Sequence, residues 1–251
     1  MTHLFWLSDD AWAAIEPHLP HGKPGKPRVD DRRVISGILH VLKTGCRWRD
    51  CPSKYGPHTT IYNRYNRWSK RRIWQRLFEK MAAAGPVPEE LCIDTSHVKA
   101  HRSAAGSKKG EYAEAIGRSR GGRTSKIHAL ADDRGRPVAF ALTPGNIADI
   151  TMAIPLLGAV DKPKRLLADK AYDADSFRNW LKRRKIKAVI PSTATRRTPY
   201  PLDRKTYRRR NVIERMFCKL KNWRRIATRY DRHAQNYLSG LALAAIVCQW
   251  I

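Results

Sequence analysis

The chain has 251 residues, of which 42% are hydrophobic and eight are Trp, so it can build a core and is not a disordered basic tail. Its 50 Lys and Arg residues face 22 Asp and Glu residues, which gives a formal net charge of +28. Such a charge predicts a polyanionic partner, either nucleic acid or an anionic membrane surface.

The apolar segments argue against the membrane. The longest of them, Leu238–Ile251, is shorter than the roughly 20 residues that span a bilayer, and it is interpreted as a core-packing helix. The N-terminus reaches Asp9 and Asp10 too early for a signal peptide. Five cysteines form no disulfide framework, so we expect a reduced, cytoplasmic protein that binds nucleic acid.

Short helices are predicted for residues 1–84, which we interpret as a small all-α DNA-binding domain. Asp30 is the expected N-cap of a helix that ends at Gly45. A short helix at 48–55, a turn at 56–58 and a basic, aromatic helix at 61–70 would then form a helix-turn-helix-like arrangement. Arg64 and Arg67 of the last helix are expected to contact DNA. The alternative is a plain helical bundle with a solvated basic face.

A boundary is expected at Gly85-Pro86-Val87-Pro88, after which the pattern changes to strands and helices. Strands are predicted at 91–98, 126–131, 138–143, 165–168 and 187–190, and helices at 148–160, 173–184, 207–224 and 235–251. Residues 103–125 are interpreted as a loop. This order is that of an RNase H-like fold, so residues 85–251 predict an α/β (α+β) domain with a mixed five-stranded sheet and flanking helices.

Three acidic residues lie where this fold would bring them to one edge of the sheet. Asp94 ends the apolar run 91–93, Asp169 ends the run 166–168, and Glu214 lies in the basic helix that follows. Carboxylates that share a site and bind Mg²⁺ are what two-metal phosphoryl transfer requires. Three further acids, Asp149, Asp173 and Asp175, are interpreted as residues at helix N-termini.

The helix that carries Glu214 has a second signal. Tyr207, Arg210, Glu214 and Lys221 fall within a stripe of about 60° on a continuous helix. The two cations could hold the DNA backbone beside the metal site. Taken alone, however, an acid among bases is more simply a salt-bridge partner.

Two basic segments are candidate DNA contacts. Residues 204–232 contain twelve Lys and Arg but only two acids, and aromatic residues interleave them, which favours a DNA channel that includes Arg224 and Arg225. The alternative is a solvated face. The loop 117–123 carries Arg118 and Arg120, which suit phosphates, although it could equally be a mobile surface loop.

The spacing Tyr-x₂-Arg-x₃-Glu-x₆-Lys at 207–221 resembles the signature of IS4/IS5-group insertion-sequence DDE transposases. Nearly the whole chain is similar to the IS5 family, near its IS427-like branch. The other matching runs are Thr44–Asp50, Ile93–Arg102, Gly117–Gly122, Thr124–His128, Ala168–Asp173 and Arg224–Asp231. The resemblance implies that Asp94, Asp169 and Glu214 are the catalytic triad and bind two Mg²⁺ ions, for which Mn²⁺ would substitute.

The resemblance further implies a bacterial, nucleoid-associated enzyme. It would bind the terminal inverted repeats of its element, cut the DNA and join the new 3′-hydroxyl to target DNA by transesterification. Its partners would be double-stranded DNA and further copies of itself, at least a homodimer on DNA. Tyr207 would orient a flanking base or phosphate. Two alternatives stay open: an RNase H-like nuclease without strand transfer, and a DNA-binding repressor that does not cut.

Overall fold

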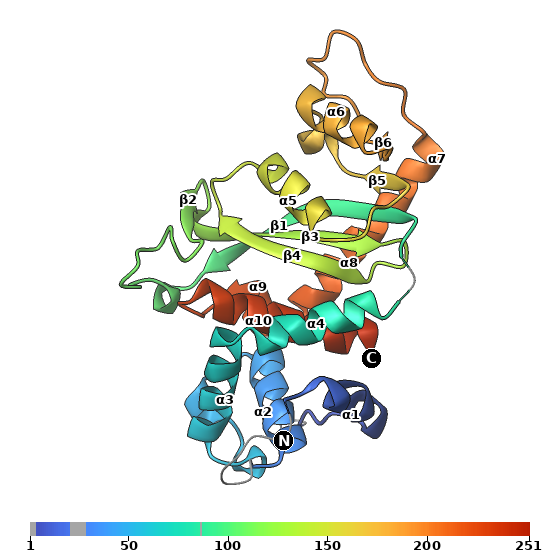
Figure 1. Ribbon diagram of the computed structural model, residues 1–251. Coiled ribbons are helices and arrows are strands. Elements are labelled where there is room, and N and C mark those ends of the chain that lie inside the picture. The colour runs from blue at the N-terminus through green and yellow to red at the C-terminus, as the bar shows by residue number, and fades with distance from the viewer. Residues whose placement is uncertain (1–3, 21–28, 86) are drawn as a thin grey trace. The chain divides into compact units, whose positions relative to one another are not determined.

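The computed structural model of the chain describes residues 4–20, 29–85 and 87–251, and it divides into two compact units (Figure 1). The first unit contains residues 1–81, 100–108 and 220–251, and the second contains residues 82–99 and 109–219. Pro86 of the expected boundary lies outside the described residues. The C-terminal residues thus pack in the same unit as the N-terminal helices. The division of DNA-binding and catalytic roles at residue 84 stays a prediction.

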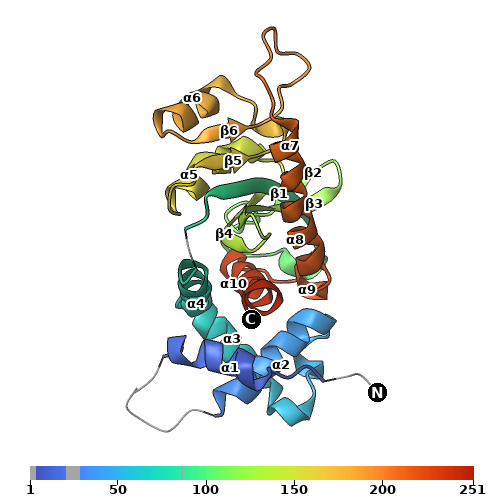
Figure 2. The same ribbon diagram turned by 90° about the vertical axis from the view of Figure 1, so that its right-hand side faces the viewer.

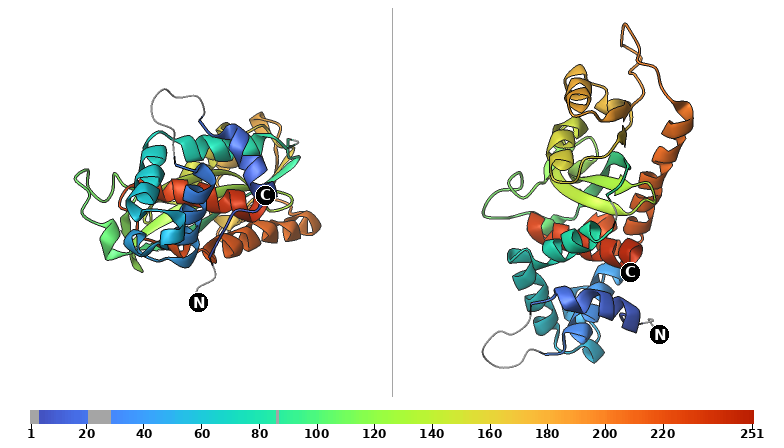
Figure 3. Two further views of the ribbon diagram at one scale, coloured as in Figure 1. Left: turned by 90° about the horizontal axis from the view of Figure 1, so that it is seen from below. Right: turned by 45° about the vertical axis from the view of Figure 1, so that its right-hand side comes forward.

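The first unit is helical. Its main helices are α1 (Asp9–Ile15), α2 (Asp31–Thr44), α3 (His58–Lys70), α4 (Ile73–Ala83, whose last two residues belong to the second unit), α9 (Arg224–Ala227) and α10 (Ala234–Ala245). Asp30 caps α2 and Gly45 ends it with φ +79°, as expected. In both panels of Figure 3, red α10 lies beside the cyan helices of residues 58–83. There the Tyr65 hydroxyl donates a hydrogen bond to the Asn236 carbonyl.

The predicted helix at 48–55 is wrong. The chain instead forms two short 3₁₀ turns, η2 (Trp48–Asp50) and η3 (Ser53–Tyr55), because Pro52 between them lacks the amide hydrogen that a continuous helix needs. Gly56, with φ +98°, then leads into α3. The helix before α3 is therefore the long α2, and η2 and η3 belong to the connection between them. The helix-turn-helix interpretation rests on α2 and α3 alone and stays a prediction.

The second unit contains the predicted mixed sheet. Its strands are β1 (Glu90–Ala100), β2 (Gly117–Ser119), β3 (Gly122–Asp132), β4 (Pro137–Pro144), β5 (Arg165–Leu167) and β6 (Lys187–Val189). β3 is antiparallel to both β1 and β4, whereas β1, β5 and β6 are parallel, which gives the order β4-β3-β1-β5-β6. These five strands are the expected ones, so the RNase H-like fold class is confirmed.

Two short strands were not predicted. β2 lies inside the segment interpreted as a loop, and it pairs with the start of β3 through Ser119 and Gly122. Glycine and serine have low strand propensity, so this strand exists because β3 offers it a partner. In the first unit, Thr228–Arg229 forms β7. Further short turns are η1 (Glu16–His18), η4 (Arg102–Ala104), η5 (Asp149–Met152), η6 (Lys170–Tyr172) and the terminal π-turn η8 (Ile246–Trp250).

Helices cover both faces of the sheet (Figure 2). On one face lie α5 (Ala153–Gly158) and α6 (Asp175–Arg183), and on the other lie α7 (Arg204–Tyr207) and α8 (Asn211–Lys221). The core between the sheet and these two helices contains Leu91, Ile93, Leu130 and Leu166 from the strands and Leu156, Phe177 and Leu181 from the helices. The continuous helix predicted from residue 207 is wrong, because η7 (Arg208–Arg210) separates α7 from α8. Across the described residues, no helix is long and apolar enough to cross a membrane.

Candidate active site

The β1–β5 ladder brings Asp94 and Asp169 to the same edge of the sheet. Cys92 pairs with Leu167 in the parallel register, and each aspartate lies two residues further along its own chain segment. Neighbouring strands lie about 4.8 Å apart, so the backbones that carry the two aspartates are adjacent here. Asp169 lies two residues after the end of β5 and caps η6, where its Oδ1 accepts a hydrogen bond from the Ala171 amide at 2.9 Å.

Asp94 lies in a partly buried and strongly polar environment. Its Oδ1 accepts a 2.8 Å hydrogen bond from the Thr95 amide, and its Oδ2 accepts one from Arg210 Nη1 at 2.9 Å. Burial raises the pKa of Asp94, the hydrogen bond from Thr95 and the charge of Arg210 oppose that rise, and the charge of Asp169 adds to it.

Glu214 reaches the same edge from α8. This helix buries an apolar stripe formed by Val212, Ile213, Met216 and Phe217, which leaves Glu214 on the exposed side with 54% of its side chain accessible. Arg210, one turn earlier, donates through Nη2 to Glu214 and through Nη1 to Asp94. One guanidinium, only 15% exposed, therefore links the strand carboxylate to the helix carboxylate.

The three carboxylates do not form a closed metal cluster. Among the described residues, no three His, Cys, Asp or Glu side chains are arranged to hold a metal ion. Arg210 is instead the shared counterion of Asp94 and Glu214. The β1–β5 register thus places Asp94 and Asp169 next to each other in the sheet, and Arg210 connects Glu214 to Asp94.

The other two residues of the predicted stripe, Tyr207 and Lys221, differ in their position relative to Arg210. Tyr207 ends α7, and its ring centroid lies 5.9 Å from Arg210 Cζ. Lys221 is the last residue of α8 and belongs to the first compact unit, so its position beside the carboxylates stays a prediction. The 3₁₀ turn changes the angular spacing of Tyr207, but the i,i+4 contact between Arg210 and Glu214 persists.

A buried polar network behind Asp94 was missed in the sequence. Thr95 Oγ1 lies 3.0 Å from His128 Nδ1 and 3.0 Å from the Tyr172 hydroxyl, and His128 Nε2 lies 2.8 Å from Thr143 Oγ1. Burial lowers the pKa of His128 to about 4, so its imidazole is neutral at pH 7. The available signal was a histidine inside the otherwise apolar run 127–131, since a buried ring needs polar partners.

Two of the arginines predicted to contact DNA are structural. Arg64 is 3% exposed, forms an ion pair with Asp31 and lies over the Trp68 ring, so it has no surface to offer DNA. Arg225 is also buried; it donates to the Cys46 carbonyl at 3.3 Å and lies over two aromatic rings. Both were misassigned because a basic residue beside aromatic ones can pack as a cation–π pair as readily as it can face solvent.

The other predicted contacts remain at the surface. Arg67, Arg118, Arg120 and Arg224 are exposed. Arg118 lies on β2 and Arg120 in the turn to β3, so the basic loop is a short hairpin. The basic segment 204–232 contributes residues to both compact units. Whether any of these side chains contacts DNA stays a prediction.

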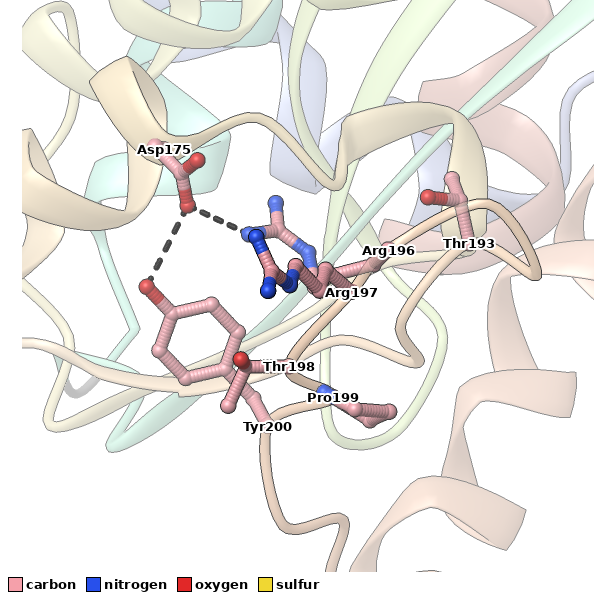
Figure 4. Close-up of a pocket in the computed structure, with 7 residues that line it drawn as sticks. All are labelled: Asp175, Thr193, Arg196, Arg197, Thr198, Pro199 and Tyr200. Carbon is pink, nitrogen blue, oxygen red and sulfur yellow. Dashed lines mark hydrogen bonds and ion pairs between the residues drawn. The ribbon is translucent and has the colours of Figure 1, made fainter.

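A second polar cluster joins α6 to the loop at 190–203. Asp173, whose side chain is fully buried, accepts hydrogen bonds from Arg178 Nε at 2.6 Å, Arg196 Nε at 2.9 Å and the Thr193 amide at 2.8 Å. A hollow of about 620 Å³ lies beside this cluster. The side chains that line it are drawn in Figure 4, where Asp175 accepts hydrogen bonds from Arg196 and from the Tyr200 hydroxyl. Asp173 therefore anchors a loop, a role beyond that of a helix N-terminal acid.

Two protein-family models match the chain. Residues 7–78 match the model described as "Putative transposase of IS4/5 family", and residues 85–247, more than half of the chain, match the model "Transposase DDE domain". The chain is an IS4/IS5-family DDE transposase. This confirms the family resemblance and the enzyme class that the sequence predicted.

Curated relatives of this transposase each match half of the chain or less. One is the "Putative transposase for insertion sequence element IS6501" of Brucella ovis, 35% identical over 48% of this chain and 94% of the relative. Another is the "Putative transposase for insertion sequence element IS402" of Burkholderia cepacia, 33% identical over 50% of this chain and 63% of the relative. A solved piggyBac transposase synaptic complex with hairpin DNA shares the fold, with a TM-score of 0.57 at 10% identity, over 96% of this transposase and 72% of that chain.

Proposed function

We propose that this transposase binds the terminal inverted repeats of its own insertion sequence, cuts the DNA at the element ends with Mg²⁺, and joins the resulting 3′-hydroxyl to target DNA by direct transesterification. The observation that supports this proposal is the convergence of Asp94 and Asp169 at one sheet edge, with Glu214 connected to Asp94 through Arg210. Arg210 balances the charge of Asp94 and Glu214 in this structure, and divalent cations would offset the mutual repulsion of all three carboxylates.

The three side chains are donors of the chemical type that divalent cations prefer. Carboxylate oxygens are the hard ligands that Mg²⁺ prefers, and an ion that keeps several waters needs only two or three side chains. Asp94 and Asp169 would hold the ions from the sheet, and Glu214 would complete the second from α8. When bound, Mg²⁺, or Mn²⁺ in its place, would polarise the scissile phosphodiester and activate the attacking hydroxyl.

The protein's own side chains prepare this edge. The Thr95 amide fixes one oxygen of Asp94, and the buried Thr95–His128–Thr143 network holds that strand segment in place. His128, whose pKa is lowered to about 4, is neutral at pH 7 and would orient Thr95 without acting as a general acid. The Arg210 guanidinium forms ion pairs with two carboxylates in this structure, and its planar geometry also matches a phosphate. When metal ions occupy the carboxylates, Arg210 would instead pair with a phosphate of the DNA backbone.

The partners follow from the reaction. Two element ends must be joined, so at least a homodimer would assemble on double-stranded DNA. The side chains proposed to contact that DNA are Tyr207, Arg210, Lys221, Arg224, Arg67, Arg118 and Arg120. Their charge is complementary to the phosphate backbone. A bacterial, nucleoid-associated location fits such an enzyme.

One assay separates the proposal from its alternatives. DNA that flanks the coding sequence is searched for short inverted repeats to serve as the substrate, and the purified protein is incubated with that DNA, a target plasmid and Mg²⁺. Joined products would support transposition, cleavage without joining would favour an RNase H-like nuclease, and sequence-specific binding without cutting would favour a repressor. The same reaction in EDTA is the control for the metal requirement.

A further inference from the structure

Glu90, the first residue of β1, is a buried acid outside the candidate metal site. It is 3% exposed, and its Oε2 accepts hydrogen bonds from Arg209 Nη2 at 2.6 Å and from Arg165 Nε at 3.1 Å. Its other oxygen, Oε1, is buried and accepts no hydrogen bond from any described residue. A buried carboxylate with an unmet oxygen is costly, so it needs an explanation.

Two consecutive arginines of η7 reach two acids of the same strand. Arg209 binds Glu90, whereas Arg210 binds Asp94. The two acids lie four residues apart on β1, a distance of about 13 Å at the rise of an extended strand. The residues immediately before α8 are therefore held along β1 at two separate points.

The turn between β3 and β4 provides a third point of contact. A Cβ atom added at Gly135 would lie 3.0 Å from the Val212 carbonyl oxygen, so the turn and the first residues of α8 approach each other closely. Gly135 also has φ +80°, which favours glycine at this position. Glu90, Asp94 and Gly135 together fix where α8 begins, and thereby where Glu214 lies.

Glu90 contributes little to stability through its two partners. Arg209 is 51% exposed and Arg165 is 36% exposed, so water would solvate both guanidinium groups if Glu90 lost its charge. Removal of one partner of a buried ion pair destabilises a protein because the other charge is left buried and unpaired, and here both remaining charges can be hydrated. What the carboxylate supplies is a fixed position for Arg209, because charge-assisted hydrogen bonds are short and directional.

We propose that Glu90 is a positioning residue that holds Arg209, and through it the start of α8, so that Glu214 is presented to Asp94 and Asp169. The inference deepens the proposed function, on which it rests. Glu90 touches neither the metal ions nor DNA in this scheme and acts only through the helix that it anchors.

Glu90→Gln tests this inference with Glu89→Gln as the matched control. Glu89 is the preceding residue and forms its own ion pair with Lys164, at 2.5 Å, on the exposed surface. We expect Glu90→Gln to unfold at a temperature close to that of the parent protein. Its affinity for Mn²⁺, measured by calorimetry, should fall about 10- to 100-fold, the range seen when residues that orient metal ligands are replaced. Glu89→Gln should match the parent protein in both measurements.

A double-mutant cycle separates positioning from a general charge effect. Arg209→Met alone should lower the affinity for Mn²⁺ as Glu90→Gln does. The double variant should bind Mn²⁺ with the same affinity as either single variant, because each substitution removes the same contact. The inference is overturned if Glu90→Gln lowers the unfolding temperature and leaves Mn²⁺ affinity unchanged, or if Glu89→Gln weakens Mn²⁺ binding equally.

Hydrogen exchange provides a readout that needs no metal. In Glu90→Gln, the amides of residues 209–214 should exchange faster than in the parent protein, while those of α6 should be unchanged. If the parent protein neither binds Mn²⁺ nor cuts DNA, the proposed function fails, but this measurement still tests the anchoring of α8. Unchanged exchange at residues 209–214 would overturn the inference by itself.

Discussion

Glu214 differs from the other two candidate metal ligands because it is attached to a helix and more than half exposed. We predict that Glu214→Gln lowers the rate of DNA cleavage about 100-fold or more, by analogy with the loss of one group that stabilises transition-state charge. The change removes a charge and keeps the shape, so affinity for the element ends and the unfolding temperature should be nearly unchanged. Cleavage kinetics and fluorescence anisotropy with labelled DNA measure the two effects separately.

The control for Glu214→Gln is Glu79→Gln, which makes the same change in charge at an exposed acid paired with Arg72. It should cut DNA at the parent rate. If Glu214→Gln loses DNA binding along with cleavage, then Glu214 serves recognition or the fold and the proposed triad is wrong.

Arg64 and Arg67 lie on the same helix and should behave in opposite ways. Arg64→Ala leaves the nearly buried Asp31 carboxylate without its ion-pair partner, so we predict that the free energy of unfolding falls by about 3 kcal/mol. Arg67→Ala removes an exposed side chain and should change that free energy by less than about 0.5 kcal/mol. Urea denaturation of both variants gives the comparison.

DNA binding completes the comparison of these two arginines. Arg67→Ala should weaken binding to the terminal repeats if α3 is a recognition helix, while Arg64→Ala should do so only under conditions in which it unfolds the protein. If a folded Arg67→Ala variant binds the terminal repeats with the affinity of the parent protein, Arg67 and its face of α3 are not part of the binding surface.

At the scale of elements, the strands were predictable where their sequence is locally distinctive. β1 contains the apolar run 91–93, which Asp94 follows, and β5 contains the start of the apolar run 166–168, which Asp169 follows. Such runs indicate a buried strand from local sequence alone. β2 was not predictable because its glycine and serine become a strand only when β3 lies beside them. The break between α7 and α8 was likewise missed, since Arg208–Arg210 have good helix propensity and their contacts are with distant acids on β1.

The same reasoning explains which parts of the candidate site were predictable. Asp94 and Asp169 could be paired from the sequence alone, because each follows an apolar run and the two runs were predicted to lie in one sheet. The polar network around His128 depends on side chains from three separate segments, and the buried role of Asp173 depends on a loop 20 residues later. Contacts of this kind are set by packing, which sequence periodicity does not report.

The anchoring of the loop at 190–203 by Asp173 is testable as a property of that element. We predict that Asp173→Asn lowers the free energy of unfolding by about 2 kcal/mol, because the variant weakens the hydrogen bonds that Arg178 and Arg196 donate to a charged acceptor. Trypsin should then cleave sooner at Arg196 and Arg197. Asp175→Asn is the control, since its carboxylate is exposed and such pairs contribute little.

The pH dependence of this effect has a definite sign. Burial opposes ionisation of Asp173, but hydrogen bonds from Arg196, the Thr193 amide and Arg178 outweigh it and lower the pKa to about 2. A lowered pKa stabilises the fold above the ordinary pKa of about 3.9, and that stabilisation is lost as the pH falls toward 2. The difference in stability between the parent protein and Asp173→Asn should therefore be constant from pH 5 to 7 and shrink below pH 4. A difference that grows on acidification would contradict this assignment.

At the scale of the whole molecule, the net charge of +28 should dominate DNA affinity. Each phosphate that a Lys or Arg neutralises releases about 0.9 counterion from duplex DNA, so the logarithm of the association constant should fall linearly with that of the salt concentration. We predict a loss of about 10³-fold or more between 50 and 200 mM salt, the range for six or more phosphate contacts. The measurement is anisotropy titration of a labelled duplex across that range.

The comparison between two duplexes separates charge from recognition. If the terminal repeat and an unrelated sequence are contacted through similar numbers of phosphates, both affinities should fall with the same slope and their ratio should stay constant. Arg67→Ala and Arg224→Ala, which each remove one exposed cation, should lower the slope by about one if the side chain binds a phosphate. Arg225→Ala, which removes a buried cation, should leave the slope unchanged in the folded protein. A slope near zero for the parent protein would mean that its excess positive charge does not face DNA, and the proposed binding surface would then be wrong as a whole.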